Sequence, residues 1–338
     1  MSTLDVRPIR TEEIAELLAF YRANFGAGGR VAELFQWRAT APEAANAPWG
    51  AWLGSDLVGT VNSVRLRLAG NGELIEAAWQ QDSIVSPAAR GKGVAKALVD
   101  AAAAGWPLVL AKGTTTAMYG LRKSVGFRDA ENHTYMFRVL RPFVAGSLYR
   151  RLGAPLLYLK AEARRQPKAP PDLVLREVAK FGEQYDDLAR QQLSGRQRGP
   201  YKTSAYLNWR YVDCPIRKYL LVEATRGGRL AGAAVLRLPT TESGDAWLVD
   251  LVASLDDEII GRELVASSIR AARQRGASLL RTFASSRQAR RHLFAAGFVD
   301  TPETPHFTFR PQSVGADVVP PSADWSFWHG DGDAELYQ

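Results

Sequence analysis

The chain has 338 residues, 46% of them hydrophobic and 23% charged, and carries a formal net charge of +8 at pH 7. Its length exceeds the roughly 250–300 residues at which a single hydrophobic core stops growing, so two domains are expected. The composition is that of a globular protein and excludes collagen-like, coiled-coil and largely disordered chains, while the positive charge leaves phosphorylated or acidic ligands open.

The N-terminus begins the first set of predicted elements. It has an acidic Asp5 and no apolar h-region, so a signal peptide is not expected. Apolar periodicity and turn residues predict alternating strands and helices from there onward. In chain order we expect a strand at 4–10, a helix from 11, a helix at 31–39, a hairpin of 49–53 and 57–68, a strand at 73–85, a helix at 91–104, a strand at 108–111, a helix at 114–125 and a strand at 134–140.

The sharpest motif follows the long predicted strand. The segment VSPAARGKGVA at 85–95 leads through a turn with two glycines into an alanine-rich helix. Free N–H groups at a helix N-terminus carry partial positive charge, and Gly91 and Gly93 let a ligand approach the backbone. Arg90 and Lys92 add charge, so the segment predicts a cradle for a pyrophosphate. It lacks the spacing of a nucleoside triphosphate loop and of a dinucleotide fingerprint.

This loop resembles the acetyl-CoA loop [RQ]-x-x-G-x-[GA] of the GNAT acetyltransferase superfamily, with Arg90, Gly93 and Ala95 at its three defined positions. The GF pair at 126–127, after a predicted helix, matches the family's habitual ending at a normal distance. The resemblance covers the order of elements over most of residues 4–140.

The resemblance implies that acetyl-CoA, as co-substrate, lies in a V-shaped opening between the strand ending at Val85 and the strand at 108–111. Its pantetheine would bond to backbone groups of the first strand, and its diphosphate would rest on the loop. No metal takes part. The implied acetyl-CoA contacts are Ser83, Ile84, Val85, Arg90, Gly91, Lys92, Gly93, Val94 and Ala95.

Acetyl transfer to an amine needs a proton for the leaving thiolate, and the family commonly supplies it from a tyrosine four residues before the glycine of GF. Arg122 stands at that position here, a departure from the pattern that makes it a second catalytic candidate. Tyr119 lies one helical turn earlier on the same face and either reaches the thiolate instead or is an ordinary packed aromatic. Residues 114–116 (TTT) replace the family's usual asparagine and are expected to cap the helix.

The candidate base is Asp82, because it is the carboxylate of the long strand close to the expected thioester. The alternatives are that Asp82 pairs with a basic residue, or that a chain of waters removes the proton. Gln80 and Gln81 precede it and are candidate binders of the amine or of a sugar.

A linker and a second set of elements follow. Residues 143–171 have a helical centre and a proline-rich end, which is typical of a linker. Three aromatic residues among the four at 325–328 predict that the C-terminal tail docks on the protein. The second set is predicted in the same order as the first, with a strand at 173–178, helices at 181–193 and 205–211, strands at 219–224, 230–238 and 246–253, a helix at 258–274, a strand at 278–283, a helix at 288–295 and a strand at 307–310.

Short motifs recur between the two sets, about 172 residues apart. Chance matches would scatter this spacing, so we expect an α/β protein of two tandem GNAT-like domains, each a mixed, mostly antiparallel sheet flanked by helices. The expected boundaries are 1–142, a linker at 143–171, 172–312 for a degenerate second domain, and 313–338 for the aromatic tail. The matching motifs are FQWR at 35–38 with LNWR at 207–210, LVG at 57–59 with LAG at 230–232, and GF at 126–127 with GF at 297–298.

The second copy is expected to have lost its acyl-CoA site. Asp256, Asp257 and Glu258 stand where a diphosphate would need cations and free N–H groups. Asp250, on the strand before this turn, is a candidate contact for a cationic substrate or a partner in a core ion pair. Trp37 ends a helix beside the implied acceptor groove, and it either binds substrate or packs next to a snorkelled arginine.

Three functions are compatible with these motifs. The first is an N-acetyltransferase that acts on the amine of a small molecule, such as an amino sugar or a natural-product amine, by direct attack in a ternary complex. The second uses a longer acyl-CoA or an acidic acyl carrier protein as donor, and the third is a non-catalytic CoA-binding protein.

Composition narrows the partners and the location. Dispersed basic residues argue against nucleic acid, and the single Cys214 with four scattered histidines argues against an internal disulfide or a metal site. The apolar stretch around 143–159 is interrupted by arginines and too short to span a membrane. We therefore expect a cytoplasmic monomer or homodimer.

Overall fold

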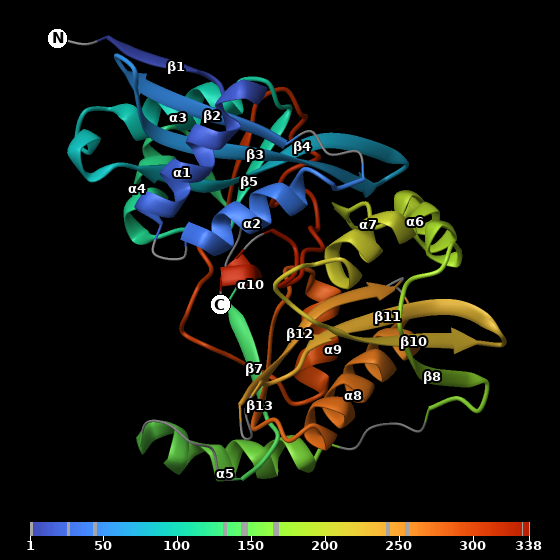
Figure 1. Ribbon diagram of the computed structural model, residues 1–338. Helices are drawn as coiled ribbons and strands as arrows, with labels where there is room; N and C mark the ends of the chain where they lie inside the picture. Colours follow the sequence, from blue (N-terminus) through green and yellow to red (C-terminus); the bar gives the residue numbers. More distant parts are fainter. Residues whose placement is uncertain are drawn as a thin grey trace.

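The computed structural model describes residues 3–25, 28–42, 46–130, 134–142, 148–164, 169–240, 244–253, 257–332 and 334–337. These residues form two mixed β-sheets, each covered by helices, with the N-terminal half above the C-terminal half in Figure 1. The predicted tandem α/β architecture is confirmed. In the described part of the chain, no helix is long and apolar enough to cross a bilayer.

The first sheet is antiparallel apart from one parallel pair, β4 with β5. Its strand order is β1-β2-β3-β4-β5-β15-β6, and β9 pairs with β3. The elements up to the linker are β1 (Leu4–Pro8), η1 (Thr11–Glu13), α1 (Ile14–Asn24), α2 (Gly28–Arg38), β2 (Asn46–Leu53), β3 (Asp56–Gly70), β4 (Glu73–Val85), η2 (Pro87–Ala89), α3 (Val94–Ala103), β5 (Leu108–Ala111), α4 (Thr116–Ser124), β6 (Arg128–Asp129), β7 (Tyr135–Val139) and α5 (Leu148–Glu162).

The second sheet repeats this plan, with β12 and β13 as its parallel pair. Its strand order is β14-β7-β13-β12-β11-β10-β8. The remaining elements are β8 (Leu173–Val178), α6 (Gln184–Ser194), β9 (Gly199–Pro200), α7 (Ser204–Leu207), η3 (Asn208–Val212), β10 (Leu220–Arg226), β11 (Arg229–Arg237), β12 (Asp245–Ala253), α8 (Glu258–Gln274), β13 (Leu279–Phe283), α9 (Arg287–Ala295), β14 (Val299–Asp300), β15 (Thr308–Pro311) and α10 (Ala334–Tyr337).

The last long strand of each copy belongs to the sheet of the other copy. β7 inserts between β13 and β14, where Phe137 lies opposite Arg281. β15 inserts between β5 and β6, where Phe309 lies opposite Leu110. The sequence predicts both strands but not the sheet to which each of them belongs. Apolar alternation predicts that a segment forms a strand, but it does not determine which other strand that segment pairs with.

Helices cover both faces of each sheet because neighbouring strand residues point to opposite sides. In the first copy, Ala51 contacts the apolar face of α3, whereas Trp52 packs under α1 and α2. In the second copy, Ala234 packs with α8, and Ala233 and Val235 pack with α6. The Figure 1 view shows α1 and α2 in front of the first sheet and α3 and α4 behind it.

The repeated tryptophans meet at the interface of the two copies. The rings of Trp37 and Trp209 stack with centroids 4.4 Å apart, and the indole N–H of Trp209 donates to the carbonyl of Trp37 at 3.2 Å. The arginines that follow them, Arg38 and Arg210, are each only 2% exposed, so the expected snorkelling is wrong. Trp37 and Trp209, which occupy equivalent positions in the two copies, therefore pack on one another at the interface.

The aromatic C-terminal tail docks between the two sheets, as the sequence predicts. Trp325 and Phe327 pack with Trp79 of β4 and Phe283 of β13 in one cluster. In Figure 1 the red C-terminal chain runs between the upper and lower halves and ends in α10. Side chains from both copies and from the tail thus share one core.

Candidate functional site

The first candidate feature is an opening between β4 and β5. These parallel strands pair at Ala78 with Val109 and at Trp79 with Leu110, and the described strands show no pairing beyond that point. A bulge at Asp82, whose φ is 51°, redirects the end of β4. The strands therefore separate toward their C-terminal ends, as a V-shaped opening requires.

Two hydroxyl groups are buried at the ends of these strands. Ser83 lies near the end of β4 and Thr114 follows β5, and neither Oγ has a hydrogen-bond partner among the described residues. Leaving a buried hydroxyl unpaired costs about 1–3 kcal/mol, so a polar ligand between the strand ends would be stabilised by both. The amide groups of a pantetheine arm match this chemistry.

The loop after β4 has the backbone of an anion cradle. Gly91 and Gly93 have φ values of 77° and 79°, in the left-handed region that favours glycine, and a Cβ at either position would meet no atom within 4 Å. Gly93 is the N-cap of α3, so the free N–H groups of that helix's first turn lie next to this open space. Arg90 and Lys92 are exposed on the same loop. These features fit a diphosphate.

The equivalent turn of the second copy is closed by its own side chain. Asp257 Oδ1 accepts hydrogen bonds from the N–H groups of Ile259 at 3.1 Å and Ile260 at 3.2 Å, at the N-terminus of α8. These are the groups that an anion would otherwise bind. Glu258 is the first residue of the helix, and Asp256 lies outside the described residues.

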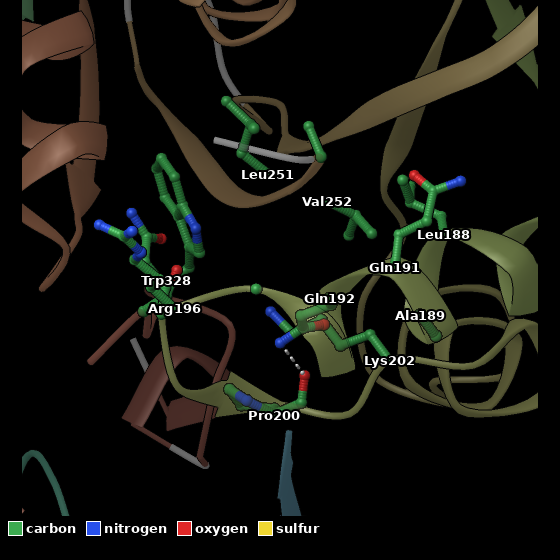
Figure 2. A pocket seen from close by; sticks show the side chains of 14 residues that line it. Leu188, Ala189, Gln191, Gln192, Arg196, Pro200, Lys202, Leu251, Val252 and Trp328 are labelled. Atoms are coloured by element: carbon green, nitrogen blue, oxygen red, sulfur yellow. Dashed lines mark hydrogen bonds between the residues drawn. The ribbon is translucent and has the colours of Figure 1, made fainter. Parts of the chain in front are cut away.

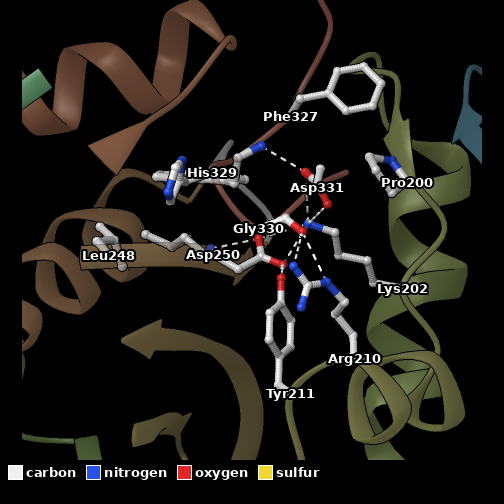
Figure 3. Close-up of polar contacts among 12 residues, drawn as sticks. Pro200, Lys202, Arg210, Tyr211, Leu248, Asp250, Phe327, His329, Gly330 and Asp331 are labelled. Atoms are coloured by element: carbon white, nitrogen blue, oxygen red, sulfur yellow. Dashed lines mark hydrogen bonds and ion pairs between the residues drawn. The ribbon is translucent and has the colours of Figure 1, made fainter. Parts of the chain in front are cut away.

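The C-terminal segment lies between the ends of β12 and β13, and Figure 3 shows its Gly330 beside Asp250 of β12. Beyond the parallel pairs, the N–H of Gly330 donates to the carbonyl of Val249 at 2.7 Å. Trp328 forms a β-bridge with Ala284, just after β13. Residues 327–330 thus bond to both strands where they separate, so in the described part of the chain the protein itself occupies this place.

The two candidate proton donors on α4 bond to different partners. Tyr119 donates its hydroxyl to Asp129 at 2.8 Å, and this hydrogen bond raises the pKa of Tyr119 above its usual value. Its ring stacks on His306 with centroids 4.5 Å apart. Arg122 is 1% exposed and donates to the carbonyl of Gln80 at 3.2 Å, where β4 and β5 begin to separate. Arg122 is therefore the donor that bonds to a strand bordering the opening.

The residues 114–116 were expected to cap α4, and Thr115 does so. Its Oγ1 accepts a hydrogen bond from the N–H of Met118 at 3.3 Å. Helix caps of this kind stabilise a helix by about 1 kcal/mol. The cap fixes the start of the helix that carries both candidate donors.

Asp82, the candidate base, forms a buried ion pair with Arg38 of α2. The side chains are 0% and 2% exposed, and the amide of Asn62 donates to the same carboxylate oxygen at 3.5 Å. The sequence analysis left open whether Asp82 acts as a base or pairs with a basic residue, and the structure shows the pairing with Arg38. A role as base requires this ion pair to open when the acceptor binds.

The neighbouring glutamines lie on opposite faces of β4. Gln80 donates its amide to the carbonyl of Val99 at 3.0 Å and so faces α3. Gln81 lines a pocket on the α2 side. Only Gln81 is therefore placed to contact an acceptor held in that pocket.

This pocket lies between the two copies. It includes Trp37 and Gln81, both predicted to bind substrate, and brings them together with residues of the second copy and of the tail. The aromatic residues at 325–328 predict that the tail docks, but not that Gly332 and Leu336 line this pocket, because a local pattern does not specify where a tail docks. The lining consists of Trp37, Arg38, Ala41, Pro42, Val64, Arg65, Leu66, Trp79, Gln81, Tyr206, Trp209, Arg210, Gly332 and Leu336.

Asp250 lies in a buried ion cluster rather than in this pocket (Figure 3). Lys202 Nζ lies 2.7 Å from both of its carboxylate oxygens, and Tyr211 donates to one of them at 2.7 Å. Asp331 of the tail binds the same ammonium at 3.0 Å. Of the two roles open for Asp250, the core ion pair is the one present.

A further cavity lies at the end of β12 (Figure 2). Leu251 and Val252 line one side, α6 lines another, and Trp328 of the tail contributes to the lining. Arg196 and Lys202 border it, but Lys202 is engaged by two carboxylates. The tail therefore bounds the second copy's cavity as well as filling its opening.

The sequence and the fold were compared with known proteins. Residues 5–118 match the family model described as "Acetyltransferase (GNAT) domain". No curated protein matches the sequence significantly.

Solved structures share the fold over nearly the whole chain. A probable N-acyltransferase from Enterococcus faecalis has a TM-score of 0.66 at 13% identity, covering 94% of this chain and 75% of that one. A GCN5-related N-acetyltransferase from Anabaena variabilis has a TM-score of 0.64 at 11% identity, with coverages of 91% and 73%. A tandem GNAT protein from the clavulanic acid biosynthesis pathway has a TM-score of 0.52 at 14% identity, with coverages of 91% and 97%.

These findings agree with the geometry of the first copy. The N-terminal half carries the match to an acetyltransferase (GNAT) domain, and the whole chain has the fold of tandem GNAT proteins.

Proposed function

We propose that this chain is an N-acetyltransferase that moves the acetyl group of acetyl-CoA to the amine of a small molecule, such as an amino sugar or a natural-product amine. The observation that carries the proposal is that the cradle and the pocket between the copies both adjoin the same strand, β4. The open cradle at Gly91 and Gly93 follows the strand's C-terminal end, and Gln81 near its middle lines the pocket between the copies. A donor in the opening would meet an acceptor in the pocket at the same strand.

The proposed reaction is direct attack in a ternary complex. The amine nitrogen forms a C–N bond to the acetyl carbonyl carbon, the C–S bond breaks, the nitrogen loses a proton and the CoA sulfur leaves as a thiolate that gains one. Ser83 and Thr114, with the backbone at the end of β4, would hold the arm of the donor, and residues 90–95 would hold its diphosphate.

The negative charge that develops on the CoA sulfur would be stabilised by residues of α4. Arg122 carries a permanent positive charge close to the separating strands and would stabilise the developing thiolate electrostatically. Tyr119, held protonated by its bond to Asp129, is the alternative donor. The amine would lose its proton to Asp82 after its ion pair opens, or to water.

Two alternatives keep the same site. A longer acyl-CoA or an acyl carrier protein would replace acetyl-CoA as donor, with an acidic carrier attracted by the net charge of +8. A non-catalytic CoA-binding protein would bind donor without turnover. The exposed positions of Arg90 and Lys92 on the cradle favour a donor with its own diphosphate.

The test is a panel of amines incubated with acetyl-CoA, in which thiol release and the acetylated amine are both measured. Amine-dependent thiol release with a matching amide product supports the proposal. Tight acetyl-CoA binding without product from any amine would favour the non-catalytic CoA-binding protein. Turnover only with longer acyl donors would show that the transferred group is a longer acyl group and not acetyl.

A further inference from the structure

The arginines of the pocket between the copies are already engaged in ion pairs. Each is matched by a carboxylate, and the guanidinium of Arg65 bonds its partner twice, at 2.6 and 2.8 Å. An anionic acceptor would have to displace one of these acids. The pairs are Arg38 with Asp82, Arg65 with Glu76, and Arg210 with Glu335.

The rest of the lining is mainly aromatic and aliphatic. Trp37 and Trp209, whose rings stack on one another, pack in one apolar cluster with Leu336, which is 1% exposed, and all three line the pocket. Trp79 and Leu66 line the pocket as well. Such a surface gains free energy by burying an aromatic or branched apolar group and little from a bare sugar.

The tail fixes Leu336 in this position through buried ion pairs. Glu335 is fully buried, and its carboxylate accepts a hydrogen bond from Tyr219 at 2.7 Å and faces Arg210 at 3.2 Å and Arg237 at 3.1 Å. Earlier in the tail, Lys112 holds the carbonyls of residues 328 and 329 at 2.9 and 3.2 Å. The segment is therefore anchored by cations of both copies.

The tail also has a docking place shaped for it in the second copy. Gly330 lies so close to β12 that a Cβ would come within 2.4 Å of the Tyr211 hydroxyl and 2.7 Å of Val249 Cγ1. The guanidinium of Arg210 donates to its carbonyl at 2.9 and 3.1 Å. The opening that the second copy does not offer to a ligand thus serves to position the end of the chain.

We propose that the acceptor is an amine carrying an aromatic or bulky apolar group, and that Leu336, held by the docked tail, is a specificity-determining residue for that group. The inference rests on the proposed function in one respect, that the pocket between the copies receives the acceptor. It goes beyond that function by assigning the acceptor's chemical class and a role for the C-terminal segment.

The experiment compares 2-phenylethylamine with glucosamine in the full-length chain. Wild type, Leu336→Ala and Leu336→Phe are measured beside a matched control, Leu156→Ala, whose side chain is 57% exposed on α5. For each variant, kcat/KM with acetyl-CoA is measured for both amines, and binding of 2-phenylethylamine is followed by calorimetry.

We expect the wild type to prefer 2-phenylethylamine. Leu336→Ala should reduce that preference by about 10-fold or more, the usual effect of lost apolar contacts in a pocket, through KM and with acetyl-CoA affinity unchanged. Leu336→Phe, which narrows the pocket, should lower kcat/KM for 2-phenylethylamine more than kcat/KM for glucosamine. Leu156→Ala should match the wild type.

A second variant tests the docking itself. Gly330→Ala should expose the tail, so that chymotrypsin cleaves at the aromatic residues 325–328 of this variant and not of the wild type, and the preference should fall as in Leu336→Ala. Intact protection together with unchanged preference in Gly330→Ala would overturn the role of the tail.

The remaining outcomes separate this inference from the proposed function. If 2-phenylethylamine binds in a Leu336-dependent manner but no thiol is released, the proposed acetyl transfer fails, and the selectivity of the pocket for apolar amines stands. A wild type that prefers glucosamine, or a Leu336→Ala variant indistinguishable from Leu156→Ala, would overturn the inference while leaving acetyl transfer intact.

Discussion

Arg122 stands where the GNAT pattern places a tyrosine, and its surroundings suggest what the exchange does. A guanidinium cannot give up a proton near neutral pH, so Arg122 can lower the energy of a thiolate only by its charge and its hydrogen bonds. It is buried and bonded to the carbonyl of Gln80. A fixed positive charge in a site screened from water stabilises a developing anion more than the same charge in solvent.

This assignment predicts different effects for the two α4 residues. Arg122→Met should lower kcat by about 100-fold, as the loss of one electrostatic donor does elsewhere, with little change in the Kd for acetyl-CoA. Arg122→Lys should keep part of the activity, because it retains the charge but not the planar fork. Tyr119→Phe should change kcat far less, since its hydroxyl is committed to Asp129.

Steady-state kinetics of the three variants provides the measurement, with thermal unfolding to confirm that each is folded. The unfolding control matters because Arg122→Met leaves the carbonyl of Gln80 without this donor. A Tyr119→Phe variant as slow as Arg122→Met would make Tyr119 the proton donor, in place of the tyrosine that the family has at the position of Arg122.

Residue types were easier to predict than residue partners. The glycines and charges of the loop at 85–95 and the helix after it predict a diphosphate site, because exposed N–H groups and positive charge suit a phosphate. Binding at this loop stays a prediction. The pairing of Asp82 with Arg38 joins a strand to a helix 44 positions away in sequence. Only the tertiary arrangement brings such groups together.

At the scale of elements, several predictions agree with the structure at both ends. The strand at 73–85 and the helix at 258–274 coincide with β4 and α8. Long apolar periodicity and a capping aspartate mark such elements clearly. The two-residue strands β6, β9 and β14 have no periodicity to detect, and they were not predicted.

The exchange of β7 and β15 predicts how fragments of the chain behave. A fragment 1–142 leaves β5 without its neighbour β15 and carries β7 without β13. Unpaired edges of this kind promote aggregation. We expect fragment 1–142 to be poorly soluble, whereas residues 1–130 joined by a short glycine-serine linker to 304–313 should be soluble and bind acetyl-CoA.

Soluble yield and size-exclusion profiles of the two fragments check this expectation. The second fragment differs mainly in exchanging β7 for β15, so it serves as the matched comparison. A fragment 1–142 that is soluble, monomeric and cooperatively folded, with the linked fragment no better, would contradict the exchange.

For the whole molecule, the sequence predicts the duplication, which the tandem fold confirms. It also predicts that the second copy has no acyl-CoA site, and this stays a prediction. The acidic residues 256–258 predict that a diphosphate is repelled, and the structure shows in addition that Asp257 caps α8. The filling of the β12–β13 opening by residues 327–330 depends on the path of the tail across both copies. Local sequence patterns contain no information about such a path.

The central claim is that one copy binds acetyl-CoA and the other has its place taken by the chain itself. Calorimetric titration of acetyl-CoA into the full-length protein tests it most directly. We expect one site per chain. Gly93→Glu should abolish binding because it puts a carboxylate in the cradle. Gly105→Glu should retain binding, since a side chain at that position also meets open space. Two equivalent sites per chain, or unchanged binding in Gly93→Glu, would contradict it.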